Sequence, residues 1–351
     1  MASDDDAEIR RNISIRHFVF GTAILRVKET KTVKKLSLFM MFFLAILLIG
    51  CQAEQETLEP QGHLVFGFSQ LGDESEWRTA HSSDIRSAAE SADIQLLFDN
   101  AQQQQFNQIK AIRSFILKGV DVIAFSPIVE EGWDNVLMEA REAGIPVIVV
   151  DRKIETDDPS LYTAFIGSDF YREGVRAGEF IRDRFSDVGG SVRIAEISGT
   201  EGSSPMIGRY EGMRSVLNQD SRFEIVISVS GDFMRSRGRE SMEAILQEVP
   251  DIDVLFAHND DMALGAIEVL EEHGIIPGVD IIIISVDAQT SGLEALRQGR
   301  INCLVECSPY IGEELMELAL AIVGGESFNR YTYTETRVFT DQDDFDTLPE
   351  R

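Results

Sequence analysis

The stretch Val254–Leu270, VLFAHNDDMALGAIEVL, joins a short apolar run directly to an amphipathic pattern. Its first four residues, VLFA, are typical of a strand that is buried on both faces, as in a parallel sheet. Apolar residues then recur at helical spacing, at Met262, Leu264, Ile267 and Leu270. The stretch therefore predicts a buried strand followed at once by a helix, which is the repeating unit of α/β folds.

Three polar residues, Asn259, Asp260 and Asp261, occupy the turn between this strand and this helix. Asn and Asp cap helix N-termini well, and a carboxylate there suits the positive end of the helix dipole. One cap needs only one such residue. Ligands of open parallel sheets bind outside the carboxyl ends of the strands. The turn thus predicts either a cap alone or a cap combined with a ligand site.

The same unit recurs along the chain, in strand-like runs that alternate with helical patterns. The runs are LVFGFSQ, IQLLFDN, VDVIAFSP, IPVIVVDR, YTAFIGSD, VRIAEISG, FEIVISVSGD, VLFAHND, IIIISVDA and CLVECSP. About ten such strands fit two doubly wound α/β domains better than one, and 351 residues are enough for two domains. The fold class is therefore expected to be α/β, with two parallel sheets.

Polar and aromatic residues gather where these runs end, which is one edge of each parallel sheet. They are Ser69, Trp77, Arg78, Ser126, Asp151, Arg152, Phe233, Asn259 and Asp287. Carboxylates, amides and arginine forks bind hydroxyl groups, and aromatic rings offer apolar plates for the faces of a ring. The mixture indicates an uncharged, polyhydroxylated small molecule. Two simpler interpretations stay open: Asp151 and Arg152 form a structural salt bridge, and Trp77 is a core aromatic.

Composition narrows the function further. The net charge of −28 argues against a nucleic-acid partner, because phosphate binding needs a cationic face. The sequence has no nucleophile elbow, no phosphate-binding loop and no dinucleotide fingerprint. Asp260 and Asp261 are adjacent and point differently at a helix start, which disfavours paired acid–base work. These observations predict a binding protein without a cofactor rather than an enzyme.

The N-terminal stretch KKLSLFMMFFLAILLIGC (34–51) is built like a secretory signal. Its apolar run from Leu36 to Ile49 is too short for an ordinary membrane span. The ending LIGC resembles a bacterial lipobox, which makes Cys51 the expected lipidated residue. A plain signal peptide or an anchor helix with an incidental cysteine is the alternative.

Three segments follow from this assignment: a signal peptide over 1–50, a tether over 51–62, and the folded chain after it. The residues before about 27–33 are acidic and polar and fit no signal peptide. We therefore expect translation to begin near Val27 or Val33 rather than at Met1.

Cys303 and Cys307 are the cysteines that remain after Cys51. Four residues along a strand separate them by roughly 13 Å, which is too far for a disulfide. The sequence has no paired CxxC motif and no histidine-rich partner for these cysteines, so it does not predict a metal site.

Five segments together resemble the periplasmic sugar-binding proteins of the ribose/galactose type, and most closely the galactofuranose-binding proteins of ABC importers. They are GFSQLGDESEWR, QIKAIRSFILKGVDVIAFSP, IPVIVVDR, SGDFMRSRGRE and FAHNDDMALGAIEVLEEHGIIPG. The resemblance covers about residues 64–340. The motif NDDMALGA also occurs in lac-repressor-like regulators, but those carry an N-terminal helix-turn-helix where this chain has a lipobox.

The resemblance implies a periplasmic binding protein type I fold, with two α/β lobes joined by three crossovers that close on sugar like a hinge. The crossovers are expected near 167–169, 307–309 and 331–335. Residues 63–168 plus 309–332 then form the N-terminal lobe. Residues 169–308 plus 333–351 form the C-terminal lobe.

The resemblance also implies roles for single residues. Asp151 and Arg152 match the pair that grips hydroxyls from the first lobe, and Arg209 matches the second-lobe arginine. Asn259 and Asp287 match the groups that complete the clamp, and one Asp next to Asn259 is expected to cap the helix. The stacking aromatics match Trp77 and Phe233, and Arg78 follows Trp77 as in the galactofuranose binder. Where the ribose binder has a glutamine, this chain has Cys307 beside Glu306, so plain ribose is not the expected ligand.

The sequence therefore predicts a lipid-anchored solute-binding protein of the periplasm or cell surface. It is expected to be a monomer that binds a monosaccharide, such as galactofuranose, and passes it to ABC permease subunits with their ATPase. Two alternatives remain. One is a sugar sensor that signals to a chemoreceptor or histidine kinase, and the other is a sugar hydrolase or isomerase that uses Asp260 and Asp287.

Overall fold

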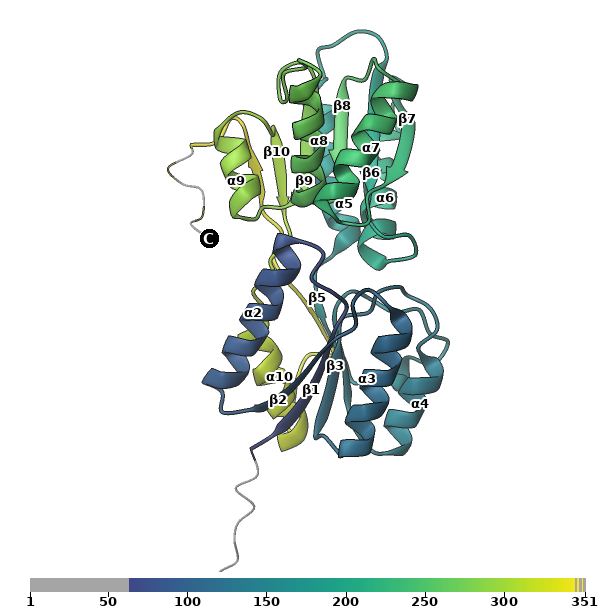
Figure 1. Cartoon of the computed structure of the whole chain (residues 1–351), viewed down its shortest axis with the longest axis vertical. Helices are drawn as coiled ribbons and strands as arrows, with labels where there is room; N and C mark the ends of the chain where they lie inside the picture. The colour runs from purple at the N-terminus through teal and green to yellow at the C-terminus, as the bar shows by residue number, and fades with distance from the viewer. Residues whose placement is uncertain (1–62, 345, 347–348, 350–351) are drawn as a thin grey trace, which may run out of the picture. The chain divides into compact units, whose positions relative to one another are not determined.

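The computed structural model describes residues 63–344, 346 and 349. The expected signal peptide, the tether and Cys51 lie outside the described residues. Within the described part, the strands form two six-stranded sheets, each of which belongs to one lobe (Figure 1).

The first sheet has the order β11-β5-β4-β3-β1-β2, and all its strands are parallel. Its strands are β1 (Val65–Gln70), β2 (Gln95–Asn100), β3 (Val122–Phe125), β4 (Val147–Asp151), β5 (Ala164–Gly167) and β11 (Tyr331–Tyr333). The helices of this lobe are α2 (Glu76–Ser91), α3 (Gln105–Lys118), α4 (Asp134–Glu142), α10 (Gly312–Gly324) and the 3-10 turn η1 (Pro159–Leu161). Helices α2 and α10 cover one face of the sheet, and α3 and α4 cover the other.

The second sheet repeats the plan with the order β12-β10-β9-β8-β6-β7. Its strands are β6 (Val192–Ser198), β7 (Phe223–Ser230), β8 (Val254–Ala257), β9 (Ile282–Asp287), β10 (Cys303–Glu306) and β12 (Val338–Thr340). Its helices are α5 (Phe170–Arg184), α6 (Ser204–Leu217), α7 (Arg235–Glu248), α8 (Asp260–Glu272) and α9 (Thr290–Arg297). Helices α5 and α6 pack on one face, and α7, α8 and α9 pack on the other. The edge strand β12 runs antiparallel to β10, which the sequence patterns did not indicate.

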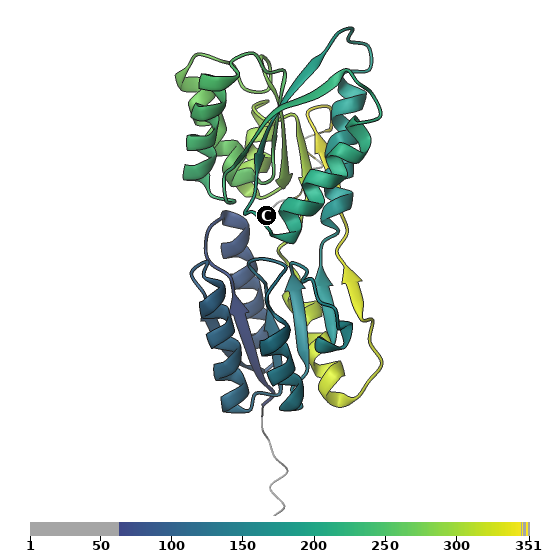
Figure 2. The same cartoon turned by 90° about the vertical axis from the view of Figure 1, so that its right-hand side faces the viewer.

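Both sheets have the strand order of a doubly wound fold, in which the winding reverses between the first and third strands. The reversal lies between β1 and β3 in the first sheet and between β6 and β8 in the second. The chain passes between the lobes three times: after Gly167, after Glu306, and between Tyr333 and Val338 (Figure 2). Tyr333 pairs with Gly167, so it belongs to the first sheet rather than to the expected second-lobe segment 333–351. The predicted α/β class, with two doubly wound lobes and three crossovers, is confirmed.

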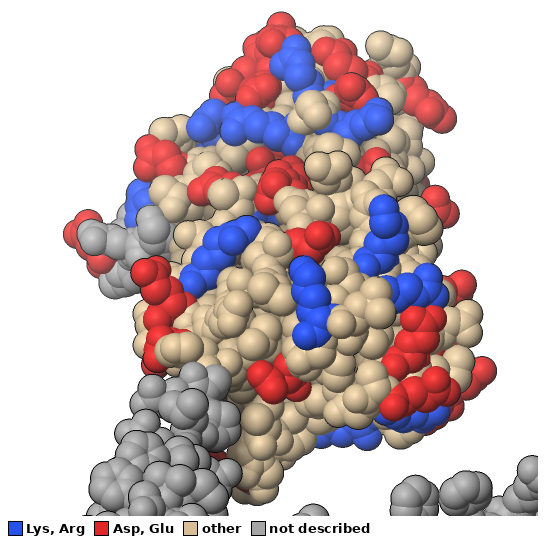
Figure 3. All heavy atoms as spheres, turned by 60° about the horizontal axis from the view of Figure 1, so that its bottom comes forward, with Lys and Arg blue, Asp and Glu red and all other residues tan. Residues whose placement is uncertain are grey.

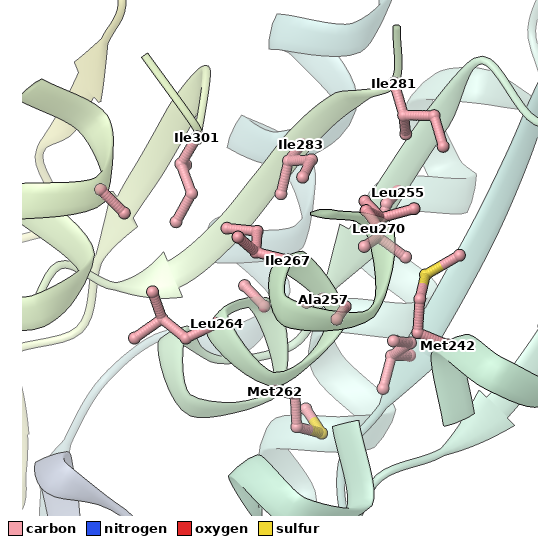
Figure 4. Close-up of a cluster of buried hydrophobic side chains, with 14 of the residues drawn as sticks. Met242, Leu255, Ala257, Met262, Leu264, Ile267, Leu270, Ile281, Ile283 and Ile301 are labelled. Carbon is pink, nitrogen blue, oxygen red and sulfur yellow. The ribbon is translucent and has the colours of Figure 1, made fainter. Parts of the chain in front are cut away.

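The opening stretch folds as its pattern predicts. All four residues of β8 are buried, and α8 begins at Asp260. The apolar stripe of α8 packs on β8 and β9, where Ile267 and Leu270 lie against Leu255 and Ile283 (Figure 4). This packing anchors the strand end that carries Asn259.

Helices α5 and α6 touch backbone to backbone because glycine lies on both sides of the contact. A Cβ added to Gly174 of α5 would lie 2.3 Å from the carbonyl oxygen of Arg209, and one added to Gly212 of α6 would lie 2.1 Å from that of Tyr171. Such distances leave no room for a side chain. The close approach fixes the position of Arg209 relative to α5.

The surface agrees with the charge argument against nucleic acid. The face drawn in Figure 3 carries both signs of charge, and acidic side chains flank the basic ones. Among the described helices, none combines the length and the apolar character that a membrane crossing requires.

Candidate functional site

A cavity lies between the two lobes, at the carboxyl ends of both sheets. It encloses about 290 Å³ of empty space, part of it open to solvent. The lining residues are Glu74, Ser75, Trp77, Arg78, Asp151, Arg152, Phe170, Pro205, Arg209, Phe233, Asn259, Asp287 and Cys307.

The two lobes are closed over this cavity. Hydrogen bonds that join them run from Glu76 N to Asp261 Oδ2 (2.7 Å), from Trp77 Nε1 to Cys307 O (2.6 Å), from Glu130 N to Gly202 O (3.0 Å), from Lys153 N to Ser204 Oγ (2.8 Å) and from Ser291 Oγ to Glu76 Oε2. Three of these five donors are backbone amides. Closure therefore depends on the backbone of one lobe meeting acceptors on the other.

The first lobe contributes a hydrogen-bonded network around Asp151. Arg78 donates from Nη1 to Asp151 Oδ2 at 2.8 Å, and the Ser126 hydroxyl donates to the same oxygen at 3.0 Å. Burial alone would raise the pKa of Asp151, but the charges of Arg78 and Arg152 hold that pKa below its ordinary value. Asp151 is therefore an ionised acceptor at neutral pH.

The second lobe contributes Arg209, which is held from behind. Its Nε donates to Glu173 at 2.8 Å, and its Nη1 donates to the carbonyl oxygen of His258. Its Nη2 lies 3.8 Å from Asp287 Oδ1. Burial raises the pKa of Asp287 well above its ordinary value, and the charge of Arg209 offsets this only in part. The arginine thus keeps one nitrogen free to face the cavity beside a buried carboxyl group.

Asn259 both lines the cavity and caps α8. Its Oδ1 accepts from Met262 N at 3.0 Å, and its Nδ2 donates to Phe233 O at 3.1 Å. The expectation that a neighbouring aspartate caps the helix was wrong, because the Asn259 side chain takes that position. An amide can serve both tasks, since it carries two donors and an acceptor with two lone pairs.

The two aspartates of the same turn have separate partners. Asp260 accepts from Ser285 Oγ and from Gln289 N, both at 2.7 Å, and so holds the turn that follows β9. Asp261 accepts from Glu76 N at 2.7 Å and so reaches the other lobe. The three polar residues that end β8 therefore have three different tasks, which explains why a single cap does not account for them.

Three aromatic residues, Trp77, Phe170 and Phe233, line the cavity. Trp77 stacks on His81 with ring centroids 4.9 Å apart. Phe233 lies under the guanidinium of Arg152, with its ring centre 5.1 Å away. A Cβ on Gly199 would lie 1.9 Å from the Phe233 ring, so a glycine at 199 makes room for this ring.

Three lining residues have left-handed backbone geometry. The φ angles are 63° at Asp151, 62° at Phe233 and 112° at Asp287. Each such residue costs about 1–3 kcal/mol and persists only where the surrounding structure enforces it. Their concentration at one cavity indicates a functional site, and they aim side chains that a regular strand end would point elsewhere.

Comparison with known proteins follows from this geometry. Residues 66–327 match the family described as periplasmic binding protein domain. The chain belongs to this family. The resemblance noted in the sequence is thereby confirmed, and the fold of these binding proteins is the one described above.

Three relatives are particularly similar to this periplasmic binding protein. The galactofuranose-binding protein YtfQ of Escherichia coli (strain K12) is 40% identical over 249 residues, which is 70% of this chain and 78% of the relative. A crystal structure from Mycobacterium smegmatis in complex with beta-D-fucofuranose has 48% identity and a TM-score of 0.78, and covers 79% of this chain and 91% of that chain. The binding protein of the arabinose ABC transporter from Shewanella sp. ANA-3, bound to alpha and beta-L-arabinofuranose, has 42% identity and a TM-score of 0.76, and covers 79% of this chain and 92% of that chain.

The cavity of this binding protein contains eight of the ten candidate ligand residues: Trp77, Arg78, Asp151, Arg152, Arg209, Phe233, Asn259 and Asp287. The other two, Ser69 and Ser126, are fully buried and do not line it. Ser126 supports Asp151 from below, and the Ser69 hydroxyl has no partner. Small side chains at strand ends thus lie in the layer beneath the cavity.

Sequence reasoning missed four lining residues, Glu74, Ser75, Phe170 and Pro205, and treated Cys307 only as a departure from the ribose binder. Phe170 and Pro205 lie in the first turns of α5 and α6, which follow β5 and β6. Their positions after strand ends could have marked them as candidate lining residues. Cys303 and Cys307 are both free, as their spacing predicts.

Proposed function

We propose that this chain is a solute-binding protein that captures a neutral monosaccharide in its furanose form. The observation that carries the proposal is the cavity between the closed lobes, which combines charged hydrogen-bonding groups with aromatic side chains. Such a lining holds several hydroxyl groups in fixed geometry while the rings cover the C–H faces of the sugar.

The charges of the lining favour an uncharged ligand. They comprise three guanidinium groups, of Arg78, Arg152 and Arg209, and three carboxyl groups, of Glu74, Asp151 and Asp287. Each guanidinium group has a carboxyl partner within 4.0 Å before a ligand enters, because Arg78 and Arg152 lie beside Glu74 and Asp151, and Arg209 lies beside Glu173. An ionised ligand would leave one buried charge unpaired, which is costly at low dielectric.

The furanose form is supported by the relatives. One of the three relatives is a galactofuranose-binding protein, and the other two are structures with bound fucofuranose and arabinofuranose. The proposed ligand residues at 77, 78, 151 and 152 lie in segments of the chain that resemble the galactofuranose binder.

We also propose that the protein binds without chemical turnover. Burial raises the pKa of the Cys307 thiol well above its ordinary value, so this lining group is a poor nucleophile. No histidine is among the lining residues. Asp260, one of the carboxylates considered for acid–base work, is engaged with Ser285 and Gln289 outside the cavity lining.

The proposed cycle is a population shift between open and closed forms. The first lobe would comprise residues 63–168 plus 309–332, and the second lobe residues 169–308 plus 333–351. Tyr333 is the exception, because it pairs with Gly167 of the first sheet. Ligand that touches both lobes favours the closed form. The closed, loaded form would then deliver the sugar to ABC permease subunits and their ATPase.

The proposed location is the periplasm or cell surface, through lipid on Cys51. Radioactive fatty acid should label the full chain in its host, and Cys51→Ala should abolish that label and release the protein from membranes. Sugar uptake by cells that lack the protein separates transport from sensing. If the protein serves transport, sugar uptake should fall in these cells. If uptake is intact but the transcriptional response to the sugar is lost, the protein is a sensor.

Calorimetric titration of the full chain with pentoses and hexoses, including galactofuranose, tests the binding proposal. One furanose should bind, and Asp151→Asn should weaken it by about 10- to 100-fold, because an ionised acceptor becomes a neutral amide. The matched control is Asp251→Asn, because the Asp251 side chain is 72% exposed and lies away from the cavity. Failure of the folded, ligand-free protein to bind any sugar would reject the proposal.

A further inference from the structure

Helix α2 of the first lobe is capped in part by a residue of the second lobe. The Ser75 hydroxyl caps the helix locally by accepting from Arg78 N at 3.1 Å. The amide of Glu76, the first helical residue, instead donates to Asp261 Oδ2 at 2.7 Å. The N–H groups of a first helical turn have no partner within their own helix. Asp261 therefore supplies an acceptor to α2 that is lost when the lobes separate.

A second hydrogen bond joins the same helix end to the second lobe. Ser291, in the first turn of α9, donates from its hydroxyl to Glu76 Oε2. Glu76 thus contacts α8 through its amide and α9 through its carboxylate. The next two residues of α2, Trp77 and Arg78, line the cavity. The contact therefore positions the helix end that brings both of these side chains to the ligand.

Closure also brings carboxylates of the two lobes together at this contact. Asp261 is partly buried in the closed form, and the charges of Glu76 and Glu74 act on it from the first lobe. Burial, with contributions from these two charges, raises the pKa of Asp261, although the hydrogen bond from the Glu76 amide opposes the rise. Closure therefore places Asp261 where its protonated form is favoured.

Charged groups of the second lobe act on Asp261 as well. They are Arg235, at the start of α7, and the carboxyl groups of Asp260 and Asp287. Arg235 lowers the pKa of Asp261, but it also donates to Glu268 Oε1 at 2.6 and 2.9 Å. These groups move with Asp261 in a hinge motion, whereas the first-lobe carboxylates do not. Opening therefore removes Glu74 and Glu76 from Asp261 and returns its carboxylate to water.

Resting on the proposed function, we propose that Asp261 is a positioning residue for closure, which caps α2 from the opposite lobe and takes up a proton from solvent as the lobes close on sugar. A protonated carboxyl group still accepts through its carbonyl oxygen, so the bond from Glu76 N persists. The closed form holds this proton more tightly than the open form, so sugar affinity rises as the pH falls. Binding of an uncharged ligand then depends on pH because the protein titrates.

Nuclear magnetic resonance of the carboxyl carbons in the full chain measures this proton directly. The Asp261 signal, assigned by its loss in Asp261→Asn, should titrate at a higher pH in protein saturated with galactofuranose than in free protein. The measurement compares two states of the wild type, so it does not depend on how a variant folds. Equal titration midpoints in the free and the bound protein would overturn the inference.

Calorimetric titration with galactofuranose at pH 5 and pH 8 measures the effect on binding. Asp261→Asn should bind about threefold or more tightly than the wild type at pH 8, because its amide accepts from Glu76 N without a charge. This advantage should shrink at pH 5. Asp261→Ala, which has no acceptor, should bind about 5- to 10-fold more weakly than Asp261→Asn at both values. The control Asp251→Asn changes an exposed carboxylate of the same lobe and should follow the wild type.

The outcomes separate this inference from the proposed function. If the wild type binds no sugar, the proposed function fails and the inference fails with it. If sugar binds but Asp261→Asn differs from the wild type by the same factor at both pH values, only the inference is overturned. Weaker binding by Asp261→Asn than by the wild type at pH 8 would also overturn it, because the charged carboxylate would then favour closure.

Discussion

Replacing Asp260 by asparagine should make the protein more stable at alkaline pH. The Asp260 residue is 1% exposed, and the charges of Asp261 and Glu76 lie near it. Burial, with a smaller contribution from these two carboxylates, raises the pKa of Asp260 to about 7, although the hydrogen bonds from Ser285 and Gln289 oppose the rise. The folded protein therefore binds this proton more tightly than the unfolded chain, whose aspartates titrate near 3.8.

The direction of the pH dependence follows from that difference. The stability linked to Asp260 is fully present below about pH 4 and is lost as pH rises to about 7. Integrating between pH 5 and pH 8 gives a loss of about 2–3 kcal/mol from this one residue. In Asp260→Asn the side-chain oxygen can still accept from Gln289 N, and the new amide can donate to the Ser285 hydroxyl. The variant should thus lack this part of the pH dependence and exceed the wild type in stability at pH 8.

Urea unfolding at pH 5 and pH 8 measures the effect as a difference between variant and wild type. That difference cancels contributions from carboxyl groups that do not interact with Asp260. The Asp287 contribution changes in the same direction, because the charge of Asp260 also raises the pKa of Asp287. Asp251→Asn, which alters an exposed carboxylate, should follow the wild type at both values. An Asp260→Asn variant whose stability declines between pH 5 and pH 8 as steeply as that of the wild type would refute the reasoning.

Three further outcomes test the packing and the closure. Gly292→Ala should destabilise the C-terminal lobe by about 2 kcal/mol or more in thermal unfolding, because its Cβ would lie 2.2 Å from Asp260 Oδ2. Gly174→Ala should do the same by forcing α5 from α6, whereas Gly189→Ala, with nothing within 4 Å of the added Cβ, should change stability little; equal effects would contradict the close-packing argument. Ser204→Ala removes the acceptor of an inter-lobe hydrogen bond of 2.8 Å, so sugar affinity should fall about 5- to 10-fold in calorimetry while unliganded stability stays the same. Unchanged affinity would show that this bond does not stabilise closure.

The alternation of strands and helices could be predicted because it is written in local patterns. Strands buried on both faces are near-continuous apolar runs, and each predicted run corresponds to a strand of the two sheets. The edge strands β11 and β12 have only three residues each, with five of their six positions exposed or partly exposed, so no such run marks them. The direction of β12 depends on the crossover before it, which a local pattern does not contain.

The residues of the site also fall into two groups, those that a local pattern marks and those that only the folded chain brings to the cavity. Asp151, Arg152, Asn259 and Asp287 end or directly follow strands, so the parallel topology brings them to one edge. Glu74 lies in a polar loop and looks like any exposed residue, since its burial depends on arginines from elsewhere in the lobe. These are interactions that only the folded chain reveals.

The helix cap after β8 illustrates a further limit. Asparagine and aspartate are similarly good caps, so propensity does not choose among Asn259, Asp260 and Asp261. The choice is made by distant partners: Ser285 and Gln289 hold Asp260, and the amide of Glu76 holds Asp261. Asn259 is left to cap the helix.

The three crossovers have a consequence for synthesis. Helix α10 supplies Leu315, Met316 and Ala319 to the core of the first lobe, and β11 completes its sheet. Both elements come from the last part of the chain, more than 140 residues after β5. During synthesis, the first lobe therefore lacks one of the two helices that cover one sheet face until nearly the whole chain has emerged from the ribosome. The nascent chain would stay unfinished, and accessible to an export machinery that accepts unfolded polypeptides, for most of its time of synthesis.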